Sequence, residues 1–377
     1  MAGLLGLAGL LVHGYHPWAE DAGIYVPAVK KLLDPTLYGF GSDFFMLPAR
    51  FSIFTHVVGL SVRVTHLRLP YVLLAWYVIC LTVFIGASWQ VAEVCLKSRE
   101  AALWASALLT ACLTMPAAGS GLLLYDPYLT ARSFSTALGM LAVAAALKKK
   151  YALGALACVG AGLFHPLMAA IYVVFIALLL LLSAGRKPIT VGLLLLAGAT
   201  VILAGALSWS SVPSESYRAA VMTRSYFFLS RWKWYEIGGA FAPLIIFAGT
   251  AWLSVRQARL ELFRASVAVV MLGVVALLLG AWVTWFPSLL SAARFQPLRT
   301  FQVIYVMLFI LPLTLMVRSL TKGRAAAGAL GIVMVASIMF AAQRQAFPAT
   351  RHLEWPWADS GNRWEQAFGW IRENTPK

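Results

Sequence analysis

The chain alternates long apolar runs with short polar joints. Many of the runs approach the ~20 residues that a helix needs to cross the hydrocarbon of a bilayer. The alternation of single apolar and polar positions that marks a membrane β-barrel is missing. The pattern predicts an all-α, polytopic integral membrane protein with about 11 transmembrane helices, at residues 1–12, 69–96, 101–115, 131–147, 151–164, 166–183, 189–208, 237–254, 265–284, 298–316 and 325–342.

Composition supports this interpretation. Hydrophobic residues make up 61% of the 377 and charged residues 12%, and the mean hydropathy is +0.81. These values exclude a disordered chain, a collagen, a coiled coil and a cytosolic enzyme. The four cysteines lie inside apolar runs without metal-ligand or disulfide spacing, which is typical of small packing residues.

The basic residues favour one orientation. Thirteen of the 30 Lys and Arg residues lie in five short joints, near residues 97–99, 148–150, 186–187, 256–264 and 318–324. The positive-inside rule places these joints in the cytoplasm. The sequence therefore predicts a protein of the cell (inner) membrane with a cytoplasmic N-terminus, a transmembrane domain at 1–342 and a periplasmic tail at 343–377. The net charge of +16 then reflects the joints and predicts no nucleic-acid partner.

Three segments depart from simple crossings. The first run of about 12 residues covers only ~18 Å of a ~30 Å core, so we expect the natural chain to begin upstream of Met1. The runs at 151–164 and 166–183 are divided by His165 and Pro166, which predicts a helical hairpin with its tip near the outer leaflet. Residues 51–68, within a first outer loop at 13–68, predict an amphipathic helix in the outer interface.

The first outer loop offers carboxylates. Glu20 and Asp21 precede an apolar helical pattern, where a carboxylate can act as a general base or hold Mg²⁺ or Mn²⁺. The alternative is that the pair caps the following helix. His13 and His16 could be drawn as metal ligands beside them, although HxxH is a weak motif outside a helix.

The next outer segments add charge near apolar runs, where an unpaired charge is costly. Asp126 and Arg132 either form a mutual ion pair, or Asp126 shares a cation with Glu20 and Asp21 while Arg132 faces a phosphate. His165 is either hydrogen-bonded to a neighbouring helix or part of a substrate cavity.

A third outer segment interleaves cations with aromatic residues, and this combination suits a phosphate headgroup. The candidate phosphate ligands are Arg218, Arg224, Arg231 and Lys233, with Arg294 and Arg299 completing the cluster. We expect Arg224 or Arg231 to be the most sensitive, because aromatic residues flank them closely. Attraction to anionic lipid, worth ~1 kcal/mol per basic residue, is an equal alternative.

Two motifs resemble the GT-C superfamily of polytopic glycosyltransferases. One is the acidic pair in residues 20–25, EDAGIY, and the other is the tail 364–376, WEQAFGWIRENTP. The resemblance implies a catalytic carboxylate, Asp21 or Glu20, and a sugar donor linked to polyprenyl phosphate. It also implies an outer soluble domain, which would begin near Lys377. We therefore expect a fragment, a minimal member, or a chain completed by a partner that supplies this domain.

The sequence thus predicts a membrane glycosyltransferase of the cell envelope that binds the lipid bilayer and a lipid-linked sugar donor. Two alternatives stay open. One is a transporter or flippase for a lipid-linked or anionic substrate, which would need charged residues at mid-membrane depth and paired broken helices. The other is a non-catalytic subunit of a membrane complex.

Overall fold

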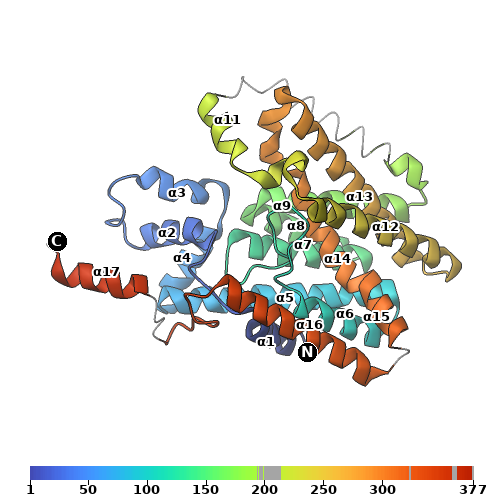
Figure 1. Cartoon of the computed structure of the whole chain (residues 1–377), viewed down its shortest axis with the longest axis horizontal. Coiled ribbons are helices and arrows are strands. Elements are labelled where there is room, and N and C mark those ends of the chain that lie inside the picture. The colour runs from blue at the N-terminus through green and yellow to red at the C-terminus, as the bar shows by residue number, and fades with distance from the viewer. Residues whose placement is uncertain (193, 195–197, 199–213, 322–323, 359–362, 376–377) are drawn as a thin grey trace.

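The computed structural model describes residues 1–192, 194, 198, 214–321, 324–358 and 363–375 (Figure 1). In this part of the chain the secondary structure is helical apart from two isolated β-bridges, Tyr15–Leu353 and Pro116–Leu123. The first nine helices are α1 (Ala2–His13), α2 (Ala22–Leu33), α3 (Ser42–Phe51), α4 (Phe54–Thr65), α5 (Leu69–Leu96), α6 (Arg99–Ala111), α7 (Ala131–Leu147), α8 (Tyr151–Phe164) and α9 (Pro166–Ser183). The later elements are α11 (Glu215–Met222), η1 (Ser225–Phe227), η2 (Leu229–Arg231), α12 (Trp234–Arg256), α13 (Leu260–Trp285), η3 (Pro287–Phe295), η4 (Pro297–Thr300), α14 (Phe301–Leu308), η5 (Phe309–Leu313), α15 (Thr314–Leu320), α16 (Ala325–Ala346) and α17 (Arg363–Asn374).

These helices cover most of each predicted apolar run, except the run at 189–208, which lies largely outside the described residues. Six described segments are long and apolar enough to cross a membrane, namely α5, α9, α12, α13, the stretch Leu290–Leu320 and α16. A seventh results if α3 and α4, bent by 98° at their junction, form one broken span. The helices α1, α7 and α8 have only 12, 17 and 14 residues, so eleven crossings stay a prediction.

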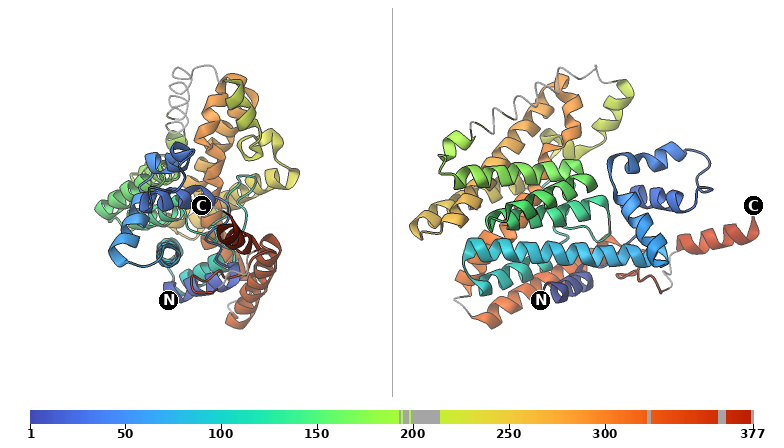
Figure 2. Two further views of the ribbon diagram at one scale, coloured as in Figure 1. Left: turned by 90° about the vertical axis from the view of Figure 1, so that its left-hand side faces the viewer. Right: turned by 180° about the vertical axis from the view of Figure 1, so that it is seen from behind.

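The helices place their connections at two opposite ends. The predicted hairpin is present, because α8 ends at Phe164, α9 begins at Pro166, and the far ends Tyr151 and Ser183 line one pocket. At that far end Lys148 donates to Gln90 of α5 at 2.9 Å, and the joints near 97 and 259 meet in a second pocket. We call this the basic end. Figures 1 and 2 show α2 to α4 and α17 at the other end, which we call the site end.

Three local features of the sequence determine how the helices α7 and α9 begin and pack. At the start of the helix α7, the amide of the N-cap residue Thr130 donates to Ser133 Oγ at 3.1 Å, which is one half of a capping box. The helix α9 begins with Pro166 at its first position, and His165 Nδ1 accepts the amide of Met168 at 3.3 Å. A Cβ at Gly139 of α7 would lie 2.3 Å from the Tyr172 ring of α9. Only glycine therefore allows the two helices to approach this closely.

A π-helical turn interrupts the last long span before α16. The turn η5 contains Pro312, which has no amide hydrogen to donate and so breaks the regular helical ladder. The Thr314 hydroxyl donates to the Phe309 carbonyl at 2.9 Å. The irregular turn is thereby stabilised within the buried core.

Candidate functional site

Three charged side chains from separate segments meet at the site end. Arg132, in the first turn of α7, donates through Nη2 and Nε to Asp126 Oδ2 at 2.7 and 2.9 Å. It also donates through Nη1 to Asp21 Oδ2 at 3.1 Å. Asp126 and Arg132 are each 5% exposed, whereas the Asp21 side chain is 41% exposed. One buried guanidinium therefore links a buried carboxylate to one that faces solvent.

The electrostatics of this triad depend on Arg132. A buried carboxylate costs several kcal/mol of lost hydration unless it is paired. Burial raises the pKa of Asp126, and the Arg132 guanidinium offsets only part of that effect. Arg132 carries a positive charge near pH 7, as arginine does in proteins, and it donates to both carboxylates. The Tyr77 hydroxyl donates to the Asp126 carbonyl at 3.1 Å and holds this loop in place.

The two residues of the acidic pair in the first loop have different surroundings. Asp21 occupies the N-cap position of α2, yet within the described structure its carboxylate makes no capping hydrogen bond. The capping alternative therefore does not account for its side chain, which turns to Arg132 instead. Glu20 is exposed and has a left-handed backbone with φ of 47°. Of the two, Asp21 belongs to the buried network.

His165 and Arg299 lie beside the triad. His165 occupies the break between α8 and α9, where the Ser135 hydroxyl donates to its carbonyl at 3.3 Å. Burial, followed by the positive charges of Arg132 and Arg299, lowers the pKa of His165 to about 4. The imidazole is therefore neutral near pH 7 and can accept or donate a hydrogen bond.

Arg299, in η4, has a hydrogen-bond donor without a partner among the described residues. Its Nε is buried and has no hydrogen-bond partner in the described part of the chain, while its guanidinium carbon lies 5.9 Å from the centroid of the Tyr226 ring. An unpaired buried donor is costly, and an anionic ligand would satisfy it. Arg299 is thus the candidate phosphate ligand that the structure brings to the triad.

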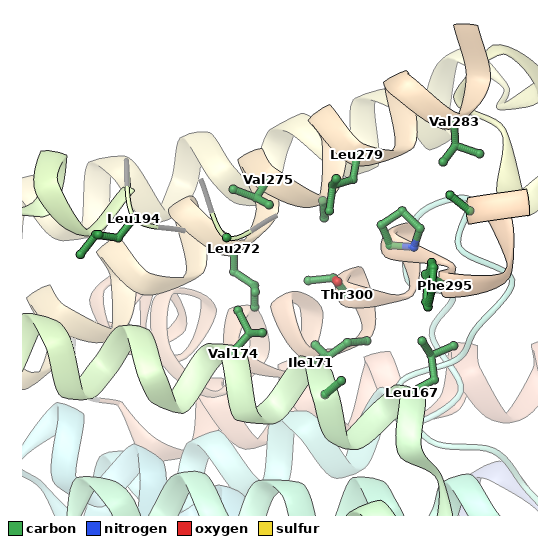
Figure 3. A pocket seen from close by; sticks show the side chains of 15 residues that line it. Leu167, Ile171, Val174, Leu194, Leu272, Val275, Leu279, Val283, Phe295 and Thr300 are labelled. Atoms are coloured by element: carbon green, nitrogen blue, oxygen red, sulfur yellow. The ribbon is translucent and has the colours of Figure 1, made fainter. Parts of the chain in front are cut away.

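An apolar pocket begins beside these charges. It has a volume of about 360 Å³ and lies between α9, α13 and the turns η3 and η4. Figure 3 shows Leu167 and Phe295 at one end of the pocket and Leu194 at the other. Leu167 follows His165 by two residues, and Pro297 and Thr300 of the lining flank Arg299. The apolar lining therefore includes residues that are close in the sequence to His165 and Arg299, and sites for amphiphilic ligands combine apolar and charged groups.

The other predicted phosphate ligands lie apart from the triad. Arg218, Arg224, Arg231, Lys233 and Arg294 all have exposed side chains. The Arg231 guanidinium donates to the carbonyl of Met222, Lys233 lies over the Tyr235 ring at 5.7 Å, and Arg294 lies over the Phe295 ring at 5.5 Å. The preference for Arg224 or Arg231 stays a prediction, which their exposure disfavours relative to Arg299, whose Nε is buried.

The predicted metal ligands do not form a cation site in this arrangement. Asp21 and Asp126 both accept from Arg132, whose guanidinium occupies the space between them. Within the described residues, no group of three or more His, Cys, Asp or Glu side chains could hold a metal ion. A divalent cation shared by Glu20, Asp21 and Asp126 stays a prediction, which the position of Arg132 disfavours.

The two histidines of the HxxH motif have separate partners. His13 bonds Thr114 Oγ1 and the Thr110 carbonyl, both at 2.8 Å. His16 Nδ1 lies 2.9 Å from Glu354 Oε1, with both side chains buried. The sequence did not point to Glu354, because 338 residues separate the pair. This contact and the Tyr15–Leu353 bridge fasten the tail segment beside the first loop.

Two tyrosines of the cluster were also missed. Tyr25 of α2 and Tyr128, before α7, lie in the electrostatic field of Asp21 and Arg132. Burial raises the pKa of both hydroxyls, so they serve as neutral hydrogen-bonding groups near pH 7. Both tyrosines lie two or more residues from these charged side chains in the sequence, so no motif pointed to them.

Comparison with known proteins identifies no relative: no protein family, curated protein or solved structure matches the chain. The chemistry of the site follows from its residues. A solvent-facing carboxylate, a buried guanidinium that orients it, a neutral imidazole and an unsatisfied arginine beside an apolar pocket can together bind an amphiphilic anion and accept a proton.

Proposed function

We propose that the protein is a GT-C-like membrane glycosyltransferase that uses a sugar linked to polyprenyl phosphate at the outer membrane face. The observation that carries this proposal is the position of Asp21. Its carboxylate is half-exposed, is held at 3.1 Å by the buried Arg132, and shares an electrostatic neighbourhood with His165 and Arg299. Residues close to those two in the sequence, namely Leu167, Pro297 and Thr300, line the apolar pocket.

Each residue of the cluster has a role in this proposal. The apolar pocket takes the proximal part of the polyprenyl chain, and Arg299 binds the phosphate. Asp21 is the general base, since Arg132 contacts its Oδ2 and the described residues give its Oδ1 no hydrogen bond. Arg132 is a positioning residue for Asp21, and Asp126 anchors Arg132. A neutral His165 hydrogen-bonds the sugar or the phosphate.

The reaction is a single displacement. The oxygen of an acceptor hydroxyl attacks the anomeric carbon while the bond between that carbon and the phosphate oxygen breaks. Polyprenyl phosphate leaves with the electron pair, and Arg299 stabilises the negative charge that develops on it. The acceptor proton moves to Asp21. One displacement without a covalent intermediate inverts the configuration of the anomeric carbon.

The experiment is a transfer assay on the purified chain in lipid nanodiscs. Polyprenyl-phosphate sugars with different sugars are supplied, and the release of free polyprenyl phosphate is measured by mass spectrometry. Asp21→Asn should abolish release, and Asp43→Asn, which makes the same change at an exposed carboxylate, should not. Release that is equal in both variants would overturn the assignment of Asp21.

The same variants separate the proposal from a transporter. In sealed proteoliposomes a flippase would move the intact lipid-linked sugar across the bilayer without cleaving it. Transbilayer movement that is lost in Asp21→Asn, without any cleavage, would assign the cluster to transport instead.

A further inference from the structure

A second polar cavity lies at the basic end. It has a volume of about 570 Å³ and is bordered by three joints that are distant in the sequence. Lys97 follows α5, Arg259 precedes α13, and Arg318 belongs to α15. We call this cavity the basic pocket.

Few negative charges offset the three cations of the basic pocket. The side chains of Lys97 and Arg259 make no hydrogen bond or ion pair with the described residues. Arg318 contacts Ser98 Oγ and Glu100 Oε2, each at 3.4 Å, and the Glu100 side chain is 63% exposed. Three like charges around one cavity repel each other, and one exposed carboxylate screens them weakly. An anion inside the cavity would lower this repulsion.

Backbone donors add to the positive potential. The helix α6 begins at Arg99, and its N-cap residue Ser98 borders the basic pocket. Ser98 Oγ accepts one amide of the first turn, that of Ala101, at 3.2 Å. The remaining first-turn amides and the helix dipole favour negative charge at this place.

The position of the basic pocket along the apolar helices indicates the source of the anion. Its lining residues stand at or near the ends of four segments that are long enough to cross a membrane, namely α5, α12, α13 and Leu290–Leu320. In a bilayer, the ends of such helices lie at the level of the lipid headgroups. Basic pockets between helices at this level bind acidic lipid headgroups.

We propose that the basic pocket binds the phosphate of an anionic phospholipid, with Arg259 and Arg318 as its direct ligands and Lys97 at its entrance. This inference is independent of the proposed glycosyl transfer, since the pocket lies at the opposite end of the helices from Asp21. It requires only that the described apolar helices lie in a bilayer.

Native mass spectrometry of the purified full chain, titrated with phosphatidylglycerol or phosphatidylcholine, tests the proposal. We expect phosphatidylglycerol to bind in preference, and Arg259→Gln and Arg318→Gln each to weaken its binding at least about tenfold. The matched control is Arg256→Gln, three residues from Arg259, whose exposed guanidinium lies 3.8 Å from the Trp252 ring centroid outside the pocket. This control should retain binding.

A second variant separates the cavity from the charge. Ser319→Trp fills the pocket from an exposed position and leaves all three cations in place, so it should also abolish preferential binding. Equal losses in all three arginine variants, or full binding by Ser319→Trp, would show a diffuse surface potential and overturn the proposal. Stabilisation against heat by inorganic phosphate alone, without preference for phosphatidylglycerol, would assign a free anion as the ligand and overturn it as well.

Discussion

The Asp21 carboxylate lies 3.1 Å from the Arg132 guanidinium, although 111 residues separate the two in the chain. The contact turns a residue at the start of α2 away from the amides that it could cap. It also brings the first loop and the start of α7 together in one site. The half-exposed carboxylate of Asp21 is then held by a buried partner, and a general base or an acceptor for a ligand hydroxyl requires such positioning.

Asp21→Asn should lower sugar transfer at least ~100-fold while the protein remains folded, because an amide keeps the shape but cannot accept a proton. Glu20→Gln should cause a smaller loss, since Glu20 is exposed and lies outside the buried network. Turnover of both variants in nanodiscs, with size-exclusion profiles as the control for folding, measures the difference. A larger loss in Glu20→Gln would transfer the role of base to that residue.

Arg132→Gln should lower the free energy of unfolding by about 3–5 kcal/mol, because it leaves two carboxylates without their shared partner. Asp126→Asn combined with Arg132→Gln should be less destabilised than the sum of the single variants, because the two residues are in direct contact. Denaturant unfolding in detergent micelles measures all three. Strict additivity would show that the ion pair contributes no coupling.

Acidification should destabilise the protein between about pH 6.5 and pH 4 through His165. The folded pKa of His165 is lowered to about 4 from an ordinary value of 6.5. Within that window the unfolded chain binds a proton that the folded chain does not, so stability falls as the pH falls. His165→Asn keeps an acceptor for the Met168 amide but does not titrate, and its melting temperature should therefore depend less on pH over this range. Identical pH profiles would contradict the assignment.

Arg299→Lys should weaken donor binding more than Arg218→Lys, Arg224→Lys or Arg231→Lys. A lysine retains the charge but loses the planar fork and the Nε donor that is buried at position 299. The exposed arginines respond mainly to the surface potential of the membrane, which depends on charge. Binding isotherms with a fluorescent polyprenyl-phosphate sugar compare the four variants. Small and equal losses would leave lipid attraction as the role of all four.

Labelling of introduced cysteines should show the orientation. A membrane-impermeant maleimide added to intact cells should modify Cys at Ser214 and spare Cys at Lys149, since both positions are exposed and lie at opposite ends of the helices. Cys80, Cys95 and Cys112 are buried, and replacement of the half-buried Cys158 by Ala removes the remaining background. The reverse labelling pattern would place the Asp21 site on the cytoplasmic face.

Local features of the fold were accessible from the sequence. The apolar runs and the break at His165 and Pro166 located α8 and α9. The length of an apolar run and a proline at the first position of a helix are properties of a single segment, so the sequence alone shows them. The Asp126–Arg132 ion pair was one of two alternatives, since six residues of loop and helix start allow the contact. The choice of Asp21 over Glu20 as the proposed base required the position of Arg132 relative to α2.

Long-range features were not accessible. Six arginines and lysines were candidate phosphate ligands, and composition could not separate Arg299, whose Nε is buried, from the exposed Arg224 and Arg231. The packing of η4 against α13 and α14 decides which guanidinium lies near the triad. The pairing of His16 with Glu354 depends in the same way on how the tail folds back. No periodic pattern of residues in the sequence predicts that contact.

The contact of His16 with Glu354 also bears on the order of biosynthesis. A ribosome makes the first loop long before residue 354, which is 338 positions later. Until then the His16 ring and the carbonyl of Tyr15, which accepts the Glu354 amide at 3.0 Å, lack their partners. The contacts between the first loop and the tail segment therefore form late, after the helices α1 to α16 have been translated.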